Sequence, residues 1–419
     1  MSVRAAGVLS PSFRKAGPAS TTDPCEIIGG ADTHVDTIHL AVISVTGQPM
    51  ADREFPTTES GYRAAIEFLS GHGVPRVVGV EGTSSYGAGL TRALAAEGIP
   101  VVEVCRPDRA ARRCIGKTDT LDSYAAARAA LSGHGVSEPK DERTSVVRAL
   151  LGARRSAVKA RTASINQIKA LLVSAPESVR ARFRGHTTKE LIAELTRTRP
   201  SAHAEPMISG ILTAAKALAD RVAFLNEQVD TLTAELNELT AVLCPALRSA
   251  LGVGPDTAAQ LFVTAGDNPE RLRGESSFAA LCGAAPVPAS SGKTTRHRLS
   301  RGGDRGANNA LHRIALVRMS RHEPTKSYVA RQTQAGRSKP EILRLLKRAI
   351  AREIYRLLTR AISIPDYADL RPARQRLNIT LTAAARHLGV WPGTLSRIER
   401  GQARDDELAN TYRAWLATA

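Results

Sequence analysis

The chain has 419 residues, which is enough for about two to four domains of ordinary size. Its composition, with 42% hydrophobic and 23% charged residues, is that of a soluble globular protein. Its charge is unusual, because 58 Lys and Arg residues against 40 Asp and Glu residues give a net charge of +18 and a pI near 10.2. A surface this basic favours a polyanionic partner such as DNA, RNA or an anionic membrane.

Other features of the composition argue against several classes of protein. No run approaches the about 18 consecutive apolar residues of a spanning helix, and the N-terminal segment lacks the apolar core of a secretion signal. The five cysteines are scattered and form no C-x-x-C pair, which argues against a zinc ribbon or a disulfide framework. Aromatic residues make up only 4%, so base stacking is not expected to be the main mode of nucleic-acid binding. We expect a cytoplasmic, nucleoid-associated protein without a membrane partner.

The positive charge is concentrated in two stretches. Residues 291–360 contain 18 Lys and Arg residues and 4 Asp and Glu residues, a net charge of +14. A second basic stretch covers residues 143–184 and places Arg154, Arg155 and Lys159 on one predicted helix. One such helix could simply have a solvated face, but two stretches in one chain favour contact with a phosphate backbone.

Residues 1–24 are predicted to be a disordered tail, and residues 25–140 carry the pattern of an α/β domain. The predicted strands are Ile27–Asp32, Thr37–Val45, Met50–Phe55, Arg76–Glu81 and Val101–Val104, and the predicted helices are Ser60–Gly71, Gly87–Glu97 and 119–132. Three meandering strands followed by alternating helices and strands predict a mixed sheet that is covered on both faces. This order suits an RNase H-like (RuvC-like) α/β fold.

Four carboxylates fall at the ends of these predicted elements. Asp32 ends the first strand, Glu81 ends the fourth, and Asp119 and Asp122 open the last helix on one of its faces. Such ends converge at one edge of an α/β sheet, where four acids would repel one another unless cations bind. Mg²⁺ accepts carboxylate and phosphate oxygens, and two such ions clamp the reacting oxygens of phosphoryl transfer. Any single acid has a simpler alternative role, since Asp119 after Thr118 could be a helix cap.

Residues 141–245 are predicted to be helical, with a heptad pattern in their second half. The apolar positions are spaced alternately by four and three residues: Ile211, Ala215, Leu218, Val222, Leu225, Val229, Leu232, Leu236, Leu239 and Leu243. Such a seam predicts a long helix that pairs with another helix. A helical hairpin within one chain is the simpler alternative, but we favour a coiled coil between subunits over residues 211–243.

Residues 246–362 are predicted to form a further, mostly helical domain that contains a candidate nucleophile. Its first part, 251–259, is a glycine turn opening a helix, and it weakly resembles a helix-hairpin-helix. Ser290 and Ser291 stand before Gly292 and Lys293, ahead of the densest basic run. A serine on a tight loop can expose its hydroxyl to a phosphate, and neighbouring cations could stabilise the pentacovalent state. Taken alone, the same pattern could be a polar turn.

Residues 371–419 carry a helix-turn-helix pattern. The helix Thr380–Leu388, a turn at Gly389 and the helix Trp391–Arg400 look like part of a Cro/repressor-type DNA-binding domain, which would bring Arg397 to a DNA groove. A vestigial helical tail is the alternative. Over the whole chain, the basic residues expected to contact nucleic acid are Lys117, Arg154, Arg155, Lys159, Lys293, Arg296, Arg298, Arg301, Arg305 and Arg397.

Several of these motifs occur together in one known family. In order they are Asp32, E-G-T at 81–83, K-T-D-T-L-D at 117–122, S-S-G-K at 290–293 and R-G-G-D-R-G-A-N at 301–308. The combination resembles the insertion-sequence 110 family of transposases, which are DEDD recombinases related to the Piv DNA invertase, and most of all its actinobacterial minicircle type. The resemblance covers roughly residues 26–362 and leaves the helix-turn-helix outside. Gly82 and Ser84-Ser85 depart from the family pattern without removing an acid.

The resemblance implies a transposase that cuts and exchanges DNA strands at the element ends and the target. It implies that the four acids bind Mg²⁺ in a RuvC-like domain, which a coiled coil joins to a C-terminal transposase domain. It implies that Ser291, with Ser290 as the alternative, becomes joined to a DNA phosphate in a site composed with the acids. It further implies a guide (bridge) RNA, which the basic helix within 143–184 would suit, and a homo-oligomer, either a dimer or a tetramer.

Three other functions are compatible with parts of the sequence. A RuvC-like endonuclease would use the same acids with water in place of serine. A DNA-binding regulator without enzymatic activity would depend on the helix-turn-helix alone. An actin-like ATPase or sugar kinase shares the first three strands, but it needs further glycine-rich phosphate loops and gains nothing from the basic cluster.

Overall fold

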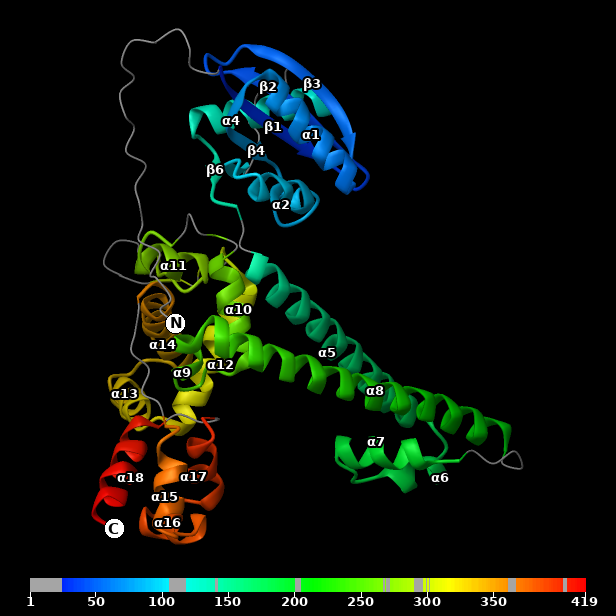
Figure 1. Ribbon diagram of the computed structural model, residues 1–419. Coiled ribbons are helices and arrows are strands. Elements are labelled where there is room, and N and C mark those ends of the chain that lie inside the picture. Colours follow the sequence, from blue (N-terminus) through cyan, green and yellow to red (C-terminus); the bar gives the residue numbers. More distant parts are fainter. Residues whose placement is uncertain are drawn as a thin grey trace. The chain divides into compact units, whose positions relative to one another are not determined.

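The computed structural model describes residues 25–104, 118–139, 142–199, 205–266, 268, 272–289, 297, 298, 300, 302–360, 367–401 and 405–419. The chain divides into two compact units, one of Met1–Ser145 with Ala265–Arg273 and one of Val146–Thr264 with Gly274–Ala419. The first unit is a mixed α/β fold and the second is mostly helical (Figure 1). The predicted change of class along the chain is therefore confirmed.

Among the described residues of the first unit, six strands form one sheet in the order β3-β2-β1-β4-β5-β6. The strands are β1 (Glu26–Thr33), β2 (Thr37–Ser44), β3 (Pro49–Pro56), β4 (Val74–Val80), β5 (Val101–Val104) and β6 (Val136–Ser137). β2 pairs antiparallel with both β1 and β3, whereas β4 runs parallel to β1 and β5 parallel to β4. The five predicted strands are confirmed, and the short antiparallel β6 was not predicted.

Helices cover both faces of this sheet, as the sequence predicts. On one face, α1 (Glu59–His72) and α2 (Ala88–Ala96) enclose a core in which Leu69 and Leu94 are fully buried. On the other face lies α4 (Asp119–Ser132), whose apolar side closes a second, smaller core. The carboxyl ends of β1 and β4 lie at the edge of these two apolar cores, where polar side chains can be accommodated.

Glycines in the sheet let α4 approach it closely. A Cβ atom at Gly30 of β1 would lie 2.1 Å from the backbone nitrogen of Ala127 and 2.3 Å from the carbonyl oxygen of Ser123. A Cβ atom at Gly79 of β4 would lie 2.5 Å from the carbonyl oxygen of Ala126. Any larger residue would push the helix backbone away from both strands. The glycines therefore fix the position of α4, and with it the acids of its first turn.

Two long helices form the first part of the second unit. They are α5 (Glu142–Ser174) and α8 (Pro206–Leu243), with the shorter α6 (Glu177–Phe183) and α7 (Thr188–Arg197) between them in the sequence. Although α8 has 38 residues, neither it nor any other helix of the described residues is long and apolar enough to cross a membrane.

α5 and α8 pack side by side in antiparallel directions (Figure 1). Ile168 of α5 shares a buried cluster with Val222 of α8, and Leu151 shares another with Leu236. The heptad seam is thus covered within one chain. A coiled coil between subunits over residues 211–243 stays a prediction, although much of its apolar seam already faces α5. The alternative of a helical hairpin within the chain is confirmed.

The rest of the second unit is a set of shorter helices and a two-stranded ribbon. Before the C-terminal helices come α9 (Pro245–Ser249), α10 (Pro255–Gly266), α11 (Glu275–Leu281), β7 (Val287–Pro288), β8 (His297–Arg298), α12 (Arg305–Arg321), α13 (Glu323–Gln334) and α14 (Lys339–Thr359). Asp304 caps α12, since its Oδ1 accepts hydrogen bonds from the backbone N–H groups of Gly306 and Ala307 at 2.6 and 3.1 Å. Its Oδ2 accepts a hydrogen bond from the hydroxyl of Thr264 at 2.6 Å. The R-G-G-D-R-G-A-N motif is therefore a helix start that is tied to α10.

The C-terminal helices α15 (Leu370–Arg376), α16 (Leu381–His387), α17 (Pro392–Glu399) and α18 (Asp406–Thr418) enclose a core of their own. Arg374 donates two hydrogen bonds to Glu399, at 2.7 and 2.9 Å, and the hydroxyl of Tyr412 donates to the same carboxylate at 2.8 Å. Gly389, at φ +67°, lies between α16 and α17 where the turn is predicted. The predicted pair of short helices is present, and DNA binding by it stays a prediction.

Candidate active site

Two of the predicted acids lie next to one another at the ends of parallel strands. Asp32 is near the end of β1, and Glu81 directly follows β4. The backbone joins the two positions, since the N–H of Glu81 donates to the carbonyl of Ala31 at 3.3 Å. The hydroxyl of Thr33 donates to the carbonyl of Glu81 at 2.8 Å. The strand pairing therefore brings these positions together as the sequence predicts.

The other two acids are in the first turn of α4. Thr118 is the N-cap, because its hydroxyl accepts a hydrogen bond from the N–H of Leu121 at 3.3 Å. Asp119 is thus not the helix cap, and the simpler role considered for it is excluded. Asp122 is only 7% exposed, whereas the side chain of Asp119 is 46% exposed. Negative charge in this turn is favoured by the helix dipole.

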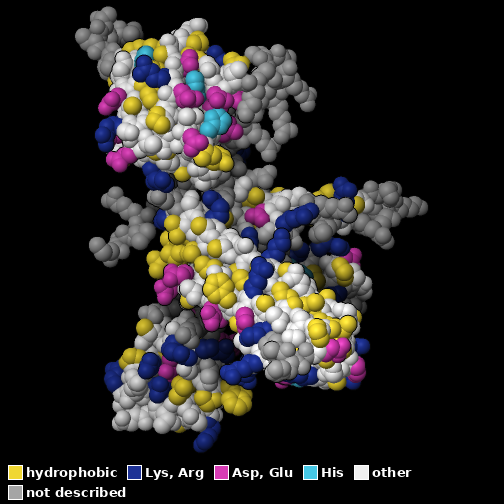
Figure 2. Space-filling view, turned by 90° about the vertical axis from the view of Figure 1, so that its right-hand side faces the viewer, with side chains coloured by type: hydrophobic (Ala, Val, Ile, Leu, Met, Phe, Trp, Pro, Cys, Tyr) yellow, Lys and Arg dark blue, Asp and Glu magenta, His cyan; other side chains and the backbone are white. Residues whose placement is uncertain are grey.

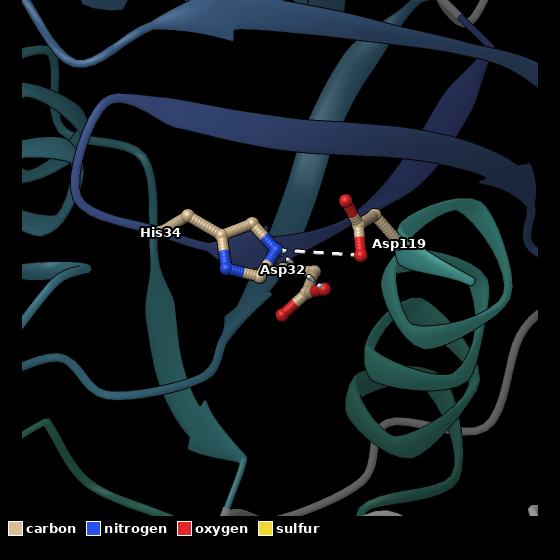
Figure 3. A group of neighbouring side chains, drawn as sticks. All are labelled: Asp32, His34 and Asp119. Atoms are coloured by element: carbon tan, nitrogen blue, oxygen red, sulfur yellow. Dashed lines mark ion pairs between the residues drawn. The ribbon is translucent and has the colours of Figure 1, made fainter. Parts of the chain in front are cut away.

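β1 and α4 bring three potential ligand atoms together (Figure 3). Nε2 of His34 lies 3.4 Å from Oδ2 of Asp32 and 3.4 Å from Oδ1 of Asp119. These donor atoms all lie within 4.8 Å of one another, which makes the three residues a possible metal site. The structure therefore unites the first and third predicted acids, and within the described residues the carboxylates of Glu81 and Asp122 are not part of this group. His34 was not predicted, although its place two residues after Asp32 was an available signal.

Burial shapes the electrostatics of Asp32. Loss of solvent raises the pKa of its carboxyl above the ordinary value, the charges of Asp122 and Asp119 raise it further, and His34 and the N–H of Thr33 oppose the rise. Oδ1 accepts a hydrogen bond from the N–H of Thr33 at 3.0 Å, but Oδ2 accepts none from the described residues. A carboxylate that is 7% exposed and only partly hydrogen-bonded gains strongly from a bound cation.

A buried carboxylate that the sequence reasoning missed supports the turn after β4. Glu103 of β5 is 6% exposed and accepts hydrogen bonds from the N–H of Thr83, at 2.8 Å, and from its hydroxyl. Thr83 follows Glu81 and Gly82 directly, so Glu103 holds in place the turn that begins with Glu81. An acid inside a short apolar strand is unusual, and that was the signal available in the sequence.

Part of the predicted site lies outside the described residues, namely Lys117, Ser290, Ser291, Lys293, Arg296 and Arg301. On either side of the serine segment, β7 and β8 pair as an antiparallel ribbon. Arg298 in β8 and Arg305 at the start of α12 are exposed. The described flanks of the segment therefore present positive charge to solvent.

The two basic stretches, far apart in the sequence, line one groove of the second unit. The groove has a volume of about 560 Å³ and lies between α5, α10 and α12. Arg155 and Lys159 of α5 are exposed on it, and Arg313 of α12 lines it as well. In Figure 2, acidic and histidine side chains gather on the first unit, whereas Lys and Arg side chains are spread over the second.

Arg154 lines the same groove but has protein partners. Its guanidinium donates to Asp256 at 2.8 Å and to the hydroxyl of Thr233 at 2.7 Å. Arg313 also pairs with Asp256. Arg154 therefore joins α5 to α8 and α10, and Arg155 and Lys159 are the more available cations of this helix.

Comparison with known sequences identifies the class of protein to which both units belong. Residues 29–175 match a family of DEDD transposases, and residues 244–330 match the "Transposase IS116/IS110/IS902 family". The class is that of the transposases, enzymes that cut and rejoin DNA. The C-terminal helices lie outside both matched ranges.

A more specific relationship follows from one relative. The "Insertion element IS110 uncharacterized 43.6 kDa protein" of Streptomyces coelicolor is 25% identical over 382 residues, which cover 79% of this chain and 93% of that protein. The chain belongs to the IS110 family of transposases, and the resemblance found in the sequence is confirmed.

Proposed function

We propose that this transposase exchanges DNA strands by phosphoryl transfer at a site with two parts, the acidic sheet edge and the serine segment. The observation that carries the proposal is the meeting of Asp32 and Asp119, which come from different elements and whose carboxylates both approach His34. The strand order, with β1 between antiparallel β2 and parallel β4, supports an RNase H-like fold of the RuvC type.

Mg²⁺ is the cation that we propose for the acids Asp32, Glu81, Asp119 and Asp122. Carboxylate oxygens are the ligands that it prefers, and these residues offer them at one sheet edge. Oδ2 of Asp32 accepts no hydrogen bond from the described residues, so a cation there would satisfy an oxygen that is otherwise poorly solvated. When bound, the ion stabilises the negative charge that builds up on the reacting phosphate.

Ser291 is the nucleophile in this proposal. Its hydroxyl oxygen attacks phosphorus and forms a serine phosphodiester, while the bond from phosphorus to a sugar oxygen breaks. The serine loses its proton and the departing sugar oxygen gains one, so that the step is balanced. Attack by a sugar hydroxyl of the other strand on this ester then releases the serine and completes the exchange. Exposed Arg298 and Arg305 are suited to hold the phosphate.

The groove on α5 is suited to a nucleic-acid backbone. Arg155, Lys159 and Arg313 line it, and closely spaced cations bind phosphates with release of counterions. We assign this groove to the guide RNA that the family resemblance implies. In this proposal Arg154 does not contact the RNA but holds α5 against α8 and α10. A dimer or tetramer would assemble the two parts of the site.

The test is a search for covalent protein–DNA adducts on a denaturing gel. Wild-type protein is expected to give an adduct and recombinant DNA, whereas Ser291→Ala gives neither. Ser290→Ala is the matched control and should retain both. Adduct formation and recombination by Ser291→Ala would refute the serine assignment. Metal-dependent cutting without any adduct would support the endonuclease that uses water.

A second function is favoured by the C-terminal helices. They have their own core, lie outside both family matches, and present Arg397 of α17 to solvent. We infer that α17 binds double-stranded DNA, either at the element ends or at a promoter. Arg397→Ala should weaken metal-free binding of the cognate duplex by about 1–3 kcal/mol, while Arg376→Ala, an exposed change on α15, should not. Equal affinities of the two variants would refute this role.

A further inference from the structure

His34 is placed at the acidic sheet edge by the backbone. It lies in the turn between β1 and β2, and its N–H donates to the carbonyl of Thr37 at 2.9 Å. This bond holds the residue without using its side chain, which is 41% exposed. The imidazole is therefore not needed to hold the turn, and Figure 3 shows it pointing between the carboxylates of Asp32 and Asp119, with which it forms ion pairs.

The spacing of the three donor atoms fits one ion. Neighbouring ligands of an octahedral ion with bonds of about 2.1 Å lie about 3 Å apart. Nε2 of His34 is 3.4 Å from one oxygen of Asp32 and 3.4 Å from one oxygen of Asp119. A shift of a few tenths of an ångström would bring both pairs to ligand spacing.

A second observation, the lack of hydrogen bonds to buried atoms of the group, points to a ligand. Oδ2 of Asp32 and Nε2 of His34 are both buried and make no hydrogen bond among the described residues; they contact each other only as an ion pair at 3.4 Å. Asp32 as a whole is 7% exposed, so water does not readily replace the missing partner. A buried polar atom without a partner costs about 1–3 kcal/mol, and a shared cation removes this cost for both atoms at once.

We propose that His34 is a nitrogen ligand of the metal ion held by Asp32 and Asp119. The inference rests on the metal site of the proposed function and adds to it a specificity for the ion. An imidazole nitrogen is a better donor to first-row transition-metal ions than to Mg²⁺, which strongly prefers oxygen. The centre should therefore bind Mn²⁺ more tightly than Mg²⁺, and the preference should depend on His34.

The test measures Mn²⁺ binding to the full-length protein by electron paramagnetic resonance, with Mg²⁺ as competitor. The wild-type complex is expected to show the ¹⁴N coupling of a directly bound imidazole. His34→Gln should lose this coupling, and its Mn²⁺ affinity relative to that for Mg²⁺ should fall about tenfold or more, since even changes to outer-shell partners of metal ligands cost about 10–100-fold in affinity. The turn should survive, because its hydrogen bond comes from the backbone.

His39→Gln is the matched control. His39 lies opposite Asp32 in the strand pairing, but its Nε2 is 2.7 Å from Asp52 and it belongs to no metal group of the described residues. This variant should retain both the ¹⁴N coupling and the ion preference. Persistence of the coupling in His34→Gln would overturn the inference. Tighter binding of both ions by His34→Gln would also overturn it, since His34 would then act only as a competing cation.

Asp32→Asn separates failure of this inference from failure of the proposed function. If Asp32→Asn loses Mn²⁺ while His34→Gln keeps both the ¹⁴N coupling and the ion preference of the wild type, the acidic site stands and the nitrogen ligand is refuted. If Asp32→Asn binds Mn²⁺ as wild type does, the metal site itself is refuted, and the inference falls with it.

Discussion

Asp32 at the sheet edge and Glu399 in the C-terminal helices are buried to the same extent, with 7% and 8% of their surface exposed. Burial raises the pKa of Asp32. Burial also acts to raise the pKa of Glu399, but hydrogen bonds from Arg374 and Tyr412 outweigh it and hold that pKa below its ordinary value. The difference lies in the partners: Glu399 has a permanent cation, whereas Asp32 faces two other acids and a histidine. Burial of a carboxylate thus marks a binding site only where the fold leaves it without a permanent cation.

The largest expected effect is that of Asp32→Asn. Strand exchange should fall by about 10³-fold or more, since a catalytic metal ion supplies several kcal/mol of transition-state stabilisation. In metal-free buffer the same variant should unfold at a higher temperature than wild type, because a poorly solvated charge is removed. Calorimetry with and without Mg²⁺ measures the second effect. If Asp32→Asn is less stable than wild type in metal-free buffer, the Asp32 carboxylate stabilises the fold as Glu399 does, and the difference between the two residues is refuted.

Glu399→Gln should have the opposite profile. It leaves Arg374 buried without a counter-charge, which typically costs about 3–5 kcal/mol. Both tryptophans of the chain, Trp391 and Trp415, lie in or next to the C-terminal helices, so their fluorescence during urea unfolding reports on this region alone. DNA cutting should survive under conditions where these helices stay folded. An unchanged fluorescence midpoint would contradict the structural role.

Gly30→Ala tests how the sheet edge is assembled. The added methyl group would meet backbone atoms of α4 at 2.1 and 2.3 Å, so the helix must shift. We expect a loss of about 1–3 kcal/mol of stability, and weaker metal binding because Asp119 moves with the helix. Gly71→Ala is the control, because a Cβ atom there meets nothing within 4 Å, and it should be neutral or slightly stabilising. Equal effects at both positions would refute the close approach of α4.

The smallest expected effect is a difference in pH dependence of the metal-free protein. The folded pKa of Asp32 is raised above its usual 3.8, so its contribution to stability is full below pH 3.8 and is lost as the pH rises through the folded value. The folded pKa of Glu399 is below its usual 4.5, so its contribution is present above pH 4.5 and is lost on further acidification. The stability of β1 and α17 peptides, derived from hydrogen exchange, should therefore change with pH in opposite directions. Asp32→Asn should remove the pH dependence of β1 and leave that of α17 unchanged.

Much of the fold could be predicted because its signals are local. The β-branched runs of β1, β4 and β5 and the turn at Gly389 require no tertiary information, and parallel pairing then carries Asp32 to Glu81. Asp119 and Asp122 could be placed because a capped helix start follows in the same motif. The positions of these acids could be inferred because strand ends and the start of a following helix commonly lie at the same edge of an α/β sheet.

The remaining features depend on partners that a sequence does not state. The heptads of α8 specify an apolar stripe but not which helix covers it, so a hairpin with α5 and a pairing between subunits look the same. Arg154 could be assigned a positive charge but not its contact with Asp256, which is more than a hundred residues away in the chain. His34 and Glu103 were missed because single polar residues near a strand carry no periodic signal.

The number of residues in α8 determines the length of the hairpin that it forms with α5. At about 1.5 Å per residue, the 38 residues of α8 span about 57 Å, which equals the axial rise of about 17 base pairs of duplex. One heptad corresponds to about 10 Å, or roughly three base pairs. Adding or removing a heptad in both helices would preserve their packing pattern and change this length stepwise. The length of the hairpin can therefore change only in steps of whole heptads if its apolar seam is to stay covered.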